Sequence, residues 1–284
     1  MTATSQGKRL EAGRRVFSRV LVGIDGSQPA LEAARQAAML EDVDGRLTLF
    51  FAREVPPPII GGPTTMMRFD AQEEEQRVNA EAALAAASAH VAPYATATAI
   101  HVRGTPVAKL LEEIDRDEDT LVAVGGSGIG RLRGIVEGEV TTEIVHRAPC
   151  SVLVARPAGA EFPRRILVGV DGSIESAAAY AAARHLSERF GAGLRALVAW
   201  GGKGVNERLA ALITDDGHDD SDDPPVAALL AAAELADLVV IGSRGLHGMR
   251  ALGSVSERVA HSAACSALVV REPAWQRVAE TLGR

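Results

Sequence analysis

The sequence predicts an α/β protein of two tandem domains, each built on a mostly parallel five-stranded sheet, with the second domain reduced. Apolar runs of strand length, rich in Val, Ile and Leu, alternate with Ala-rich segments of helical length, which is typical of a parallel sheet covered on both faces. In addition, residues 165–173 (RILVGVDGS) repeat residues 19–27 (RVLVGIDGS) almost letter for letter. The chain is therefore an internal duplication, and we place its domains at residues 16–157 and 163–272.

Each apolar run of the first domain stops at a turn or at a signal for the start of a helix. The first run stops at Asp25-Gly26-Ser27, where Ser27 can cap a helix and Pro29 suits its first turn. Thr105 and Pro106 give a similar signal after the third run. We expect strands at 17–24, 46–53, 95–102, 121–124 and 151–155, and helices ending near residue 40 and at 73–90, 107–114 and 140–146.

The second domain repeats this order but is shorter before its fourth strand. Residues 201–225 contain one helical pattern, at 206–213, and the acidic run 215–223, which we expect to be a solvated loop. No third strand is visible there, so we predict that the third strand is missing. The remaining expected elements are strands at 165–170, 194–200, 238–241 and 267–271, and helices at 174–190, 226–235 and 256–263.

Composition narrows the class of protein. The formal net charge of −7 argues against broad binding to nucleic acid or to anionic membranes. There is no long apolar run for a membrane span, and the start of the chain lacks the apolar segment of a signal peptide. The two cysteines, Cys150 and Cys265, precede the last strand of each repeat and suggest a reducing compartment without disulfides. We therefore expect a cytoplasmic protein whose cysteines are small buried residues.

A glycine-rich loop follows the fourth strand in each domain and leads into a helix. Glycine allows positive φ angles and close approach of a ligand to the main chain. The helix that follows presents unpaired N–H groups and the positive end of its dipole to the same point. The two loops, which begin at Gly125 and Gly242, therefore predict an anion site, such as a seat for the phosphates of a nucleotide.

These residues resemble the universal stress protein family in its tandem form, over nearly the whole chain. The resemblance is carried by the Val-Gly-Ile/Val-Asp-Gly-Ser starts, by a phosphate motif Gly-x2-Gly-x9-Gly-Ser/Thr, and by the ending Ala-Pro-Cys-Ser-Val-Leu-Val-Ala-Arg at 148–156. The family implies a nucleotide-binding-type, Rossmann-like fold and dimers or pseudo-dimers. One branch of the family binds ATP, whereas another lacks the motif and does not hold ATP.

The resemblance also implies which residues bind. Asp25 and Asp171 would face the ribose, and Ala52 and Ala199, near the ends of the second strands, would touch the base. In such sheets ligands sit beyond the carboxyl ends of the strands, where both Asp-Gly turns and both loops lie. Asp25 and Asp171 could instead simply close an Asp-Gly turn. The phosphate motif would contribute Gly125, Gly128, Gly138, Glu139, Val140 and Thr141 in the first domain, and Gly242, Gly245, Gly253, Ser254, Val255 and Ser256 in the second.

Neither copy of the motif is complete. In the second copy only seven residues separate Gly245 from Gly253, and the missing third strand would remove the counterpart of 104–106 that walls the pocket. In the first copy Glu139 replaces the Ser or Thr of the family. Three interpretations of Glu139 are open. It is a helix-start acid that weakens anion binding, or its carboxylate itself occupies the phosphate seat, or binding is retained through a bridging Mg²⁺.

We therefore expect a stress-related regulatory protein that binds a nucleotide, with ATP, alone or with Mg²⁺, as the ligand. Binding rather than catalysis would be its activity, because no nucleophile–base series stands out; slow ATP hydrolysis is the most that we would expect. The alternative is a scaffold that acts by dimerisation or partner contact, with degenerate phosphate sites. The two halves would form an intramolecular pseudo-dimer by pairing their fifth strands, with a homodimer as a further option, and we expect neither nucleic acid nor membrane as a partner.

Overall fold

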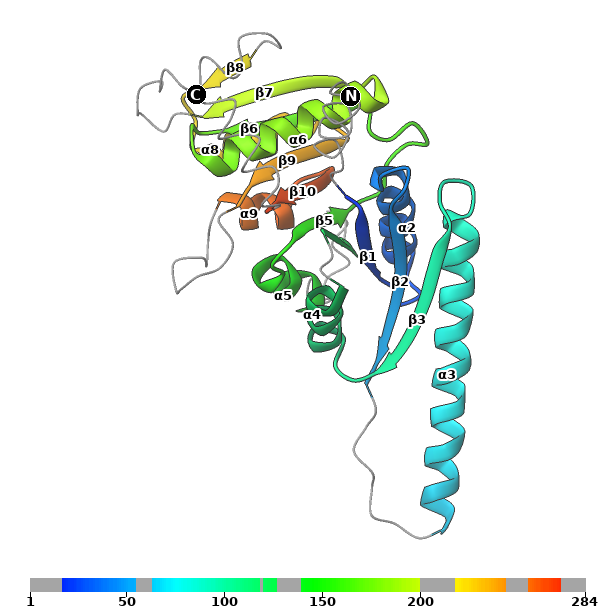
Figure 1. Cartoon of the computed structure of the whole chain (residues 1–284). Helices are drawn as coiled ribbons and strands as arrows, with labels where there is room; N and C mark the ends of the chain where they lie inside the picture. Colours follow the sequence, from blue (N-terminus) through cyan, green and yellow to red (C-terminus); the bar gives the residue numbers. More distant parts are fainter. Residues whose placement is uncertain are drawn as a thin grey trace, which may run out of the picture.

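A computed structural model of the whole chain describes residues 17–54, 63–117, 120–126, 139–199, 218–243 and 255–271 (Figure 1). Among the described elements, its two halves have the same order of strands and helices, except that α3 has no counterpart in the second half. The first half contains β1 (Arg19–Gly23), α2 (Gln28–Leu40), β2 (Arg46–Arg53), α3 (Pro63–Val91), β3 (Ala97–Arg103), α4 (Pro106–Asp117), β4 (Leu121–Gly125), α5 (Glu139–Arg147) and β5 (Ser151–Ala155). The second contains β6 (Arg165–Val170), α6 (Ile174–Phe190), β7 (Gly193–Ala199), β8 (His218–Ser221), α8 (Pro225–Ala233), β9 (Leu238–Gly242), α9 (Val255–Ser262) and β10 (Ser266–Val270).

The strands of both halves form one ten-stranded sheet in the order β3-β2-β1-β4-β5-β10-β9-β6-β7-β8. All neighbours within a half are parallel, which confirms the predicted fold class. The two halves meet where β5 and β10 pair antiparallel, with Leu153 opposite Leu268. The expectation that the fifth strands pair is therefore confirmed, and the two halves share one continuous sheet.

Helices cover both faces of this sheet, and each face has its own core. Buried residues of α2, α3 and α6 form one core, and those of α4, α5, α8 and α9 form the other. The strands supply side chains to both cores alternately, as Val20 and Leu21 do, because successive side chains of a strand point to opposite faces. Each core runs across both halves, so the chain folds around shared apolar layers.

The starts of α2 and α6 are built in the same way. Gly26 and Gly172 have φ angles of 84° and 79°, which a residue with a side chain rarely adopts. The next residue caps the helix: the Ser27 Oγ accepts a hydrogen bond from the Ala30 N–H, and the Ser173 Oγ accepts one from the Ser176 N–H. The duplicated turn therefore directs each first strand into its helix, as the sequence predicted.

Two sequence predictions were wrong. The second half has a third strand after all, because β8 pairs parallel with β7 and places Ser221 opposite Ala199. It lies within the acidic run that we expected to be a loop. In addition, α3 begins ten residues earlier than predicted, at Pro63 instead of residue 73, and in Figure 1 it extends past the end of the sheet. The helix predicted at 206–213 lies outside the described residues.

Of the described helices, none has both the length and the apolar character needed to cross a bilayer.

Candidate functional site

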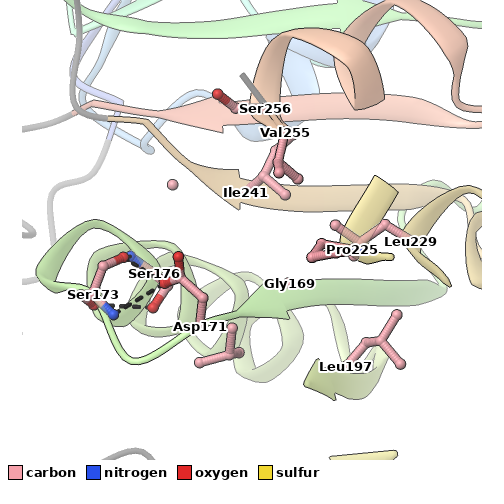
Figure 2. Close-up of a pocket in the computed structure, with 12 residues that line it drawn as sticks. Gly169, Asp171, Ser173, Ser176, Leu197, Pro225, Leu229, Ile241, Val255 and Ser256 are labelled. Atoms are coloured by element: carbon pink, nitrogen blue, oxygen red, sulfur yellow. Dashed lines mark hydrogen bonds between the residues drawn. The ribbon is translucent and has the colours of Figure 1, made fainter. Parts of the chain in front are cut away.

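A cavity of about 120 Å³ lies at the carboxyl ends of β6, β7 and β9, beside the starts of α6, α8 and α9 (Figure 2). It brings together four residues that the sequence singled out from distant parts of the second half. These residues are Asp171, Gly242, Val255 and Ser256. The strand ends and helix starts therefore converge in the second half as the sequence predicted.

The polar side of the cavity is built around Asp171. The Oδ1 atom of Asp171 accepts hydrogen bonds from the Ser173 N–H at 3.0 Å and from the Ser173 hydroxyl at 2.6 Å. Ser176 lines the same side, and its hydroxyl donates to the Ser173 carbonyl oxygen at 2.9 Å. In the first half Asp25 forms the matching turn, because its Oδ1 accepts from the Ser27 N–H at 2.8 Å. Both aspartates thus close an Asp-Gly turn, and Asp171 also faces the cavity.

The remaining wall of the cavity is apolar. In Figure 2 the apolar side chains that form it, which come from β7, α8, β9 and α9, lie across the cavity from the Asp171 turn. Leu197 comes from β7, two residues before Ala199, which the sequence had proposed instead. Pro225 and Leu229 come from α8, and Ile241 and Val255 complete the wall. The cavity therefore offers a polar edge with one carboxylate and an apolar surface opposite it.

The α8 wall corrects another prediction. We expected the second half to lack a counterpart of Gly104-Thr105-Pro106, since its third strand seemed absent. The strand registers place Ser221 where the first half has Val102, so Pro225 stands where the first half has Pro106. Pro225 begins α8 and lines the cavity. Because β8 takes the place of the missing third strand, the segment after it carries Pro225 to the position of Pro106 and forms this wall.

The last glycine of each fourth strand lies against the first turn of a helix. A Cβ atom on Gly242 would lie 2.2 Å from the Glu175 carbonyl oxygen, and one on Gly125 would lie 2.6 Å from the Pro29 carbonyl carbon. Neither position tolerates a side chain without movement of the backbone. These glycines bring the tips of β4 and β9 close to the Asp-Gly turns, which is how the two parts of each predicted site meet.

The first amide after each of these glycines is already hydrogen-bonded to the main chain. The Gly126 N–H donates to the Ala155 carbonyl oxygen at 2.8 Å, and the Ser243 N–H donates to the Val270 carbonyl oxygen at 3.1 Å. Any anion seat must therefore use amides further along each loop. The predicted loop residues Gly128, Gly138, Gly245, Gly253 and Ser254 lie outside the described part of the chain.

The helices that follow the loops each begin one residue before the predicted start, at Glu139 and Val255. Glu139 is the first residue of α5, which confirms that it is a helix-start acid, while its effect on anion binding stays a prediction. Val140 and Thr141 are half-buried in the first turn, and the Thr141 hydroxyl donates to the Gly125 carbonyl oxygen at 3.0 Å. Thr141 therefore ties the helix to the tip of β4. Its counterpart Ser256 is buried and lines the cavity of the second half.

The remaining predicted residues are placed at equivalent positions of the two halves. Ala52 pairs in register with Val102, and Ala199 pairs with Ser221, each near the end of a second strand. Ala52 is partly buried against the core formed by α4, α5, α8 and α9.

The two cysteines are buried as expected. Burial raises the pKa of the Cys265 thiol to about 11, so this thiol stays protonated at neutral pH.

Sequence reasoning missed several residues of the cavity. Leu197 and Leu229 were missed because a leucine in a predicted strand or helix is most often a core residue. Pro225 was missed because, without β8, the counterpart of Pro106 was expected to be absent. Ser173 was noted only as the repeat of Ser27, for which the sequence predicted a cap, and not as a residue of the cavity. Its hydrogen bonds to Asp171 show that the cap and the site share one turn. Alignment of the two repeats from the Asp-Gly turns onward would have indicated Pro225.

The sequence and the fold of this chain are similar to those of known proteins. The model of the universal stress protein family matches residues 17–156 and 218–271. The chain is 30% identical over 292 residues to a universal stress protein of Mycolicibacterium smegmatis, covering 89% of this chain and 96% of the relative. It is 29% identical over 295 residues to a universal stress protein of Mycobacterium tuberculosis H37Rv, with the same coverage. The crystal structure of a universal stress protein from Archaeoglobus fulgidus has the same fold, with a TM-score of 0.69 at 20% identity, over 90% of this chain and 99% of that chain.

Proposed function

The chain belongs to the universal stress protein family, and we propose that it is a stress-related regulatory protein that binds ATP in its second half. The observation that carries the proposal is the convergence of Asp171, Gly242 and Ser256 on one cavity at the carboxyl ends of the strands. Open α/β sheets bind their ligands at this edge. The parts that the repeats bring together are therefore those that a nucleotide site needs.

The chemistry of the cavity suits a nucleotide. The Asp171 carboxylate lines the cavity, and a carboxylate is a hydrogen-bond acceptor suited to ribose hydroxyl groups. Leu197, Leu229 and Pro225 offer an apolar surface for a base. Ser256, in the first turn of α9, lies where a phosphate would benefit from the positive end of the helix dipole.

The size of the cavity agrees with partial enclosure of the ligand. Pockets that enclose a whole small-molecule ligand measure roughly 300–1,000 Å³, whereas this cavity measures about 120 Å³. It suits a group of the size of a ribose, and the phosphates would extend beyond it toward the start of α9. Mg²⁺ would then be bound through the phosphates, as is usual for this ion.

Binding rather than turnover is the activity that the lining favours. Among the described residues that line the cavity, Asp171 is the one with an ionisable side chain, and its Oδ1 atom is engaged by the turn. Phosphoryl transfer needs a group that orients the attacking water and cations that neutralise the developing charge. We therefore propose that the protein holds ATP as a signal, with slow hydrolysis as the upper limit.

The first half is proposed as the weaker site because Glu139 stands where the second half has Ser254. A carboxylate about 4 Å from a phosphate oxygen would cost about 4 kcal/mol at an effective dielectric constant of 20. Glu139→Ser should therefore tighten nucleotide binding to the first half. Calorimetry that shows no change would argue against this interpretation of Glu139.

The alternative of a scaffold without a nucleotide has one observation in its favour. The first loop amide of each half, on Gly126 and Ser243, is used by the main chain and is not available to an anion. A loop whose later amides are used in the same way would bind no phosphate. The halves would then act through the continuous sheet and its surfaces alone.

One experiment separates the two functions. The purified protein is denatured, released nucleotide is identified by mass spectrometry, and Mg-ATP is titrated into nucleotide-free protein by calorimetry. Asp171→Asn should weaken binding by about 10- to 150-fold, because it removes a charged acceptor worth about 1.5–3 kcal/mol while Asn keeps the turn. Asp25→Asn is the matched control in the first half and should have little effect. Neither released nucleotide nor any heat of binding would leave the scaffold as the function.

A further inference from the structure

A cluster of potential metal ligands lies where the last helices of the two halves meet, and none of its three residues lines the cavity. His146 comes from α5, and Glu257 and His261 come from α9, one helical turn apart on the same face. One ligand atom from each residue lies within 4.8 Å of the other two. We propose that these three residues form a binding site for a divalent transition-metal ion, with zinc as the reference ion, that joins the two halves.

The repeats explain how the cluster arises. Helix α9 is the counterpart of α5 in the second half. With Cys265 equivalent to Cys150, His261 stands where the first half has His146, and Glu257 stands where it has Thr142. The antiparallel pairing of β5 with β10 relates the two helices by an approximate twofold axis and packs them together. Equivalent histidines therefore meet across the axis, and Glu257 adds a carboxylate from one side.

The donor set selects the class of metal. Two imidazoles and one carboxylate are a known ligand set for zinc, with a fourth position left to water. Nitrogen ligands favour zinc, copper, nickel and cobalt, whereas magnesium and calcium prefer sites made of oxygen. The His146 and Glu257 side chains are 17% and 18% exposed, so the site is sheltered yet open to an entering ion and its water.

The separations between the three ligand atoms are close to those of a zinc site, so the side chains need to move only slightly to bind the ion. The His146 Nε2 and the Glu257 Oε1 are 2.7 Å apart and hydrogen-bonded to each other. Ligand atoms bound to one zinc ion at about 2.0–2.1 Å in a tetrahedral arrangement lie about 3.4 Å apart. Binding would therefore open the His146–Glu257 pair slightly and draw the widest pair of ligand atoms inward. Rotation of exposed parts of these side chains can supply such shifts.

The backbone that carries the ligands is held in place. Arg156 donates to the carbonyl oxygens of Ala260 and His261 at 2.7 and 2.8 Å, at the end of α9. Arg271 donates to the Val145 carbonyl oxygen, beside His146. These two cations repel a metal ion, so the site must bind through coordination bonds and the Glu257 charge. We therefore infer a moderate affinity for zinc and little affinity for magnesium or calcium.

The test uses the full chain, freed of any affinity tag, treated with chelator and free of nucleotide. Zinc is titrated by calorimetry, and cobalt is added to obtain the visible absorption spectrum of a tetrahedral site. We expect one zinc ion per chain and a rise in melting temperature with zinc. Loss of an outer-shell group alone costs about 10–100-fold in affinity, so His146→Gln, His261→Gln and Glu257→Gln should each weaken binding at least tenfold. His90→Gln, an exposed histidine on α3, is the control.

The proposal is overturned when the wild-type protein fails to bind zinc at millimolar concentration, or when all three variants bind as tightly as the wild type. For any variant that fails to fold, Thr142→Glu replaces it. This change places a carboxylate at the position equivalent to Glu257, so it should supply a fourth ligand and tighten zinc binding about tenfold. Unchanged or weaker binding to a folded Thr142→Glu protein counts against the site. None of these outcomes depends on whether the protein binds ATP.

Discussion

Arg156 and Arg271 directly follow the last strand of their own half, and each caps the final helix of the other half. Arg156 donates to the carbonyl oxygens of Ala260, His261 and Cys265 at 2.7, 2.8 and 3.1 Å. Arg271 donates to the Ala148 carbonyl oxygen at 2.7 Å and to that of Val145. The exchange is reciprocal, so the two halves complete each other's helices.

Both guanidinium groups are buried, at 2% and 8% exposure. Burial lowers the pKa of Arg271, yet the carbonyl ends of a helix carry partial negative charge and favour a cation there. Arg156 and Arg271 are also anchored through their main chains, since their N–H groups donate to the hydroxyls of Ser266 and Ser151 at 2.9 and 3.1 Å. The junction thus combines a strand pair with two exchanged caps, and we expect the halves to unfold together.

Replacing either cap should destabilise the whole chain. Arg156→Met leaves three main-chain carbonyl groups without the guanidinium, two of them buried and one partly buried. One buried group of this kind costs about 1–3 kcal/mol when it is unsatisfied. We expect a loss of that order in the free energy of unfolding, measured with urea, and a similar loss for Arg271→Met. Arg184→Met, which removes an exposed ion pair with Glu188, is the control. A loss in the cap variants no larger than in this control would show that the caps contribute little.

Glu41 should make the stability depend on pH. Burial and, to a lesser extent, the charge of Asp42 raise its pKa, the charge of Arg189 opposes both, and the resulting pKa is about 7. A carboxyl whose pKa is higher in the folded state stabilises that state while it is protonated. Its contribution is fully present below the unfolded pKa of 4.5 and is lost as the pH rises through about 7.

Glu41→Gln should therefore raise the free energy of unfolding at about pH 8 and change it little at about pH 5. Urea titrations at both pH values measure this difference. Glu188→Gln, at an exposed position on α6, serves as the control. Equal effects of Glu41→Gln at the two pH values would contradict the prediction. The Arg189 bond to the Glu41 carbonyl oxygen, at 2.6 Å, is made by the main chain of Glu41 and is preserved in the variant.

The sequence predicted most of the fold because apolar strands and glycine turns are local signals that the duplication shows twice. It missed β8 because His218–Ser221 contains no apolar residue. Such a strand is tolerated at the edge of a sheet, where only β7 pairs with it and its side chains can face water. The register of β8 is set by its pairing with β7, whose residues lie 22 positions earlier in the chain than their partners in β8. A local pattern at His218–Ser221 therefore could not reveal it.

The candidate site could be predicted in part for the same reason. Asp171, Gly242 and Ser256 belong to repeated motifs at strand ends, and parallel strands bring their carboxyl ends to one edge. Leu197 and Leu229 carry no such signal, because a leucine in a strand or helix is most often a core residue. His146 and His261 are equivalent in the repeats, but only the antiparallel β5–β10 junction makes them neighbours.

Gly242→Ala should damage both stability and the site. Its Cβ would lie 2.2 Å from the Glu175 carbonyl oxygen, so β9 or the start of α6 must move. Overpacking of this kind costs about 1–3 kcal/mol, and the movement would separate Ser256 from Asp171. We expect a lower melting temperature and weaker binding of Mg-ATP. Gly159→Ala is the control, because a Cβ there would meet nothing within 4 Å. Equal melting temperatures for the two variants would contradict the close contact.

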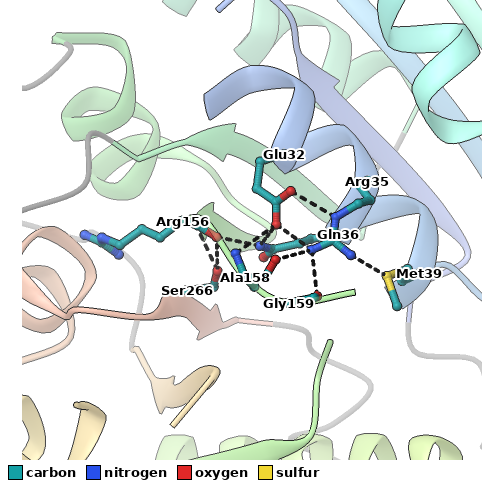
Figure 3. A network of polar contacts seen from close by, with 8 residues as sticks. All are labelled: Glu32, Arg35, Gln36, Met39, Arg156, Ala158, Gly159 and Ser266. Carbon is teal, nitrogen blue, oxygen red and sulfur yellow. Dashed lines mark hydrogen bonds and ion pairs between the residues drawn. The ribbon is translucent and has the colours of Figure 1, made fainter. Parts of the chain in front are cut away.

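The linker between the halves is held by α2, and Glu32 is central to this contact (Figure 3). The Glu32 Oε1 accepts hydrogen bonds from Arg35 at 2.6 Å and from the Gln36 side chain at 2.7 Å. It also accepts one from the linker N–H of Ala158 at 3.3 Å. Gln36, fully buried, donates in turn to the Arg156 carbonyl oxygen at 2.7 Å. One carboxylate thus organises the side chains that fix the start of the linker.

Glu32→Gln should weaken this contact in a way that depends on pH. Burial alone would raise the pKa of Glu32, but the hydrogen bonds and charge of Arg35, with those from Gln36 and Ala158, lower it overall. A lowered pKa means that the ionised form stabilises the fold, so the contribution is present above the unfolded value of 4.5 and is lost as the pH falls through the folded pKa.

At neutral pH the variant should therefore lose about 1.5–3 kcal/mol of unfolding free energy, the range for a hydrogen bond to a charged group. The difference from wild type should shrink as the pH falls below 4.5 and vanish below the folded pKa of Glu32, where both proteins carry a neutral group. Glu112→Gln, an exposed carboxylate paired with Lys109 on α4, is the matched control. A loss that stays constant with pH would mean that Glu32 acts through its shape, and its charge would then have no part in holding the two halves together.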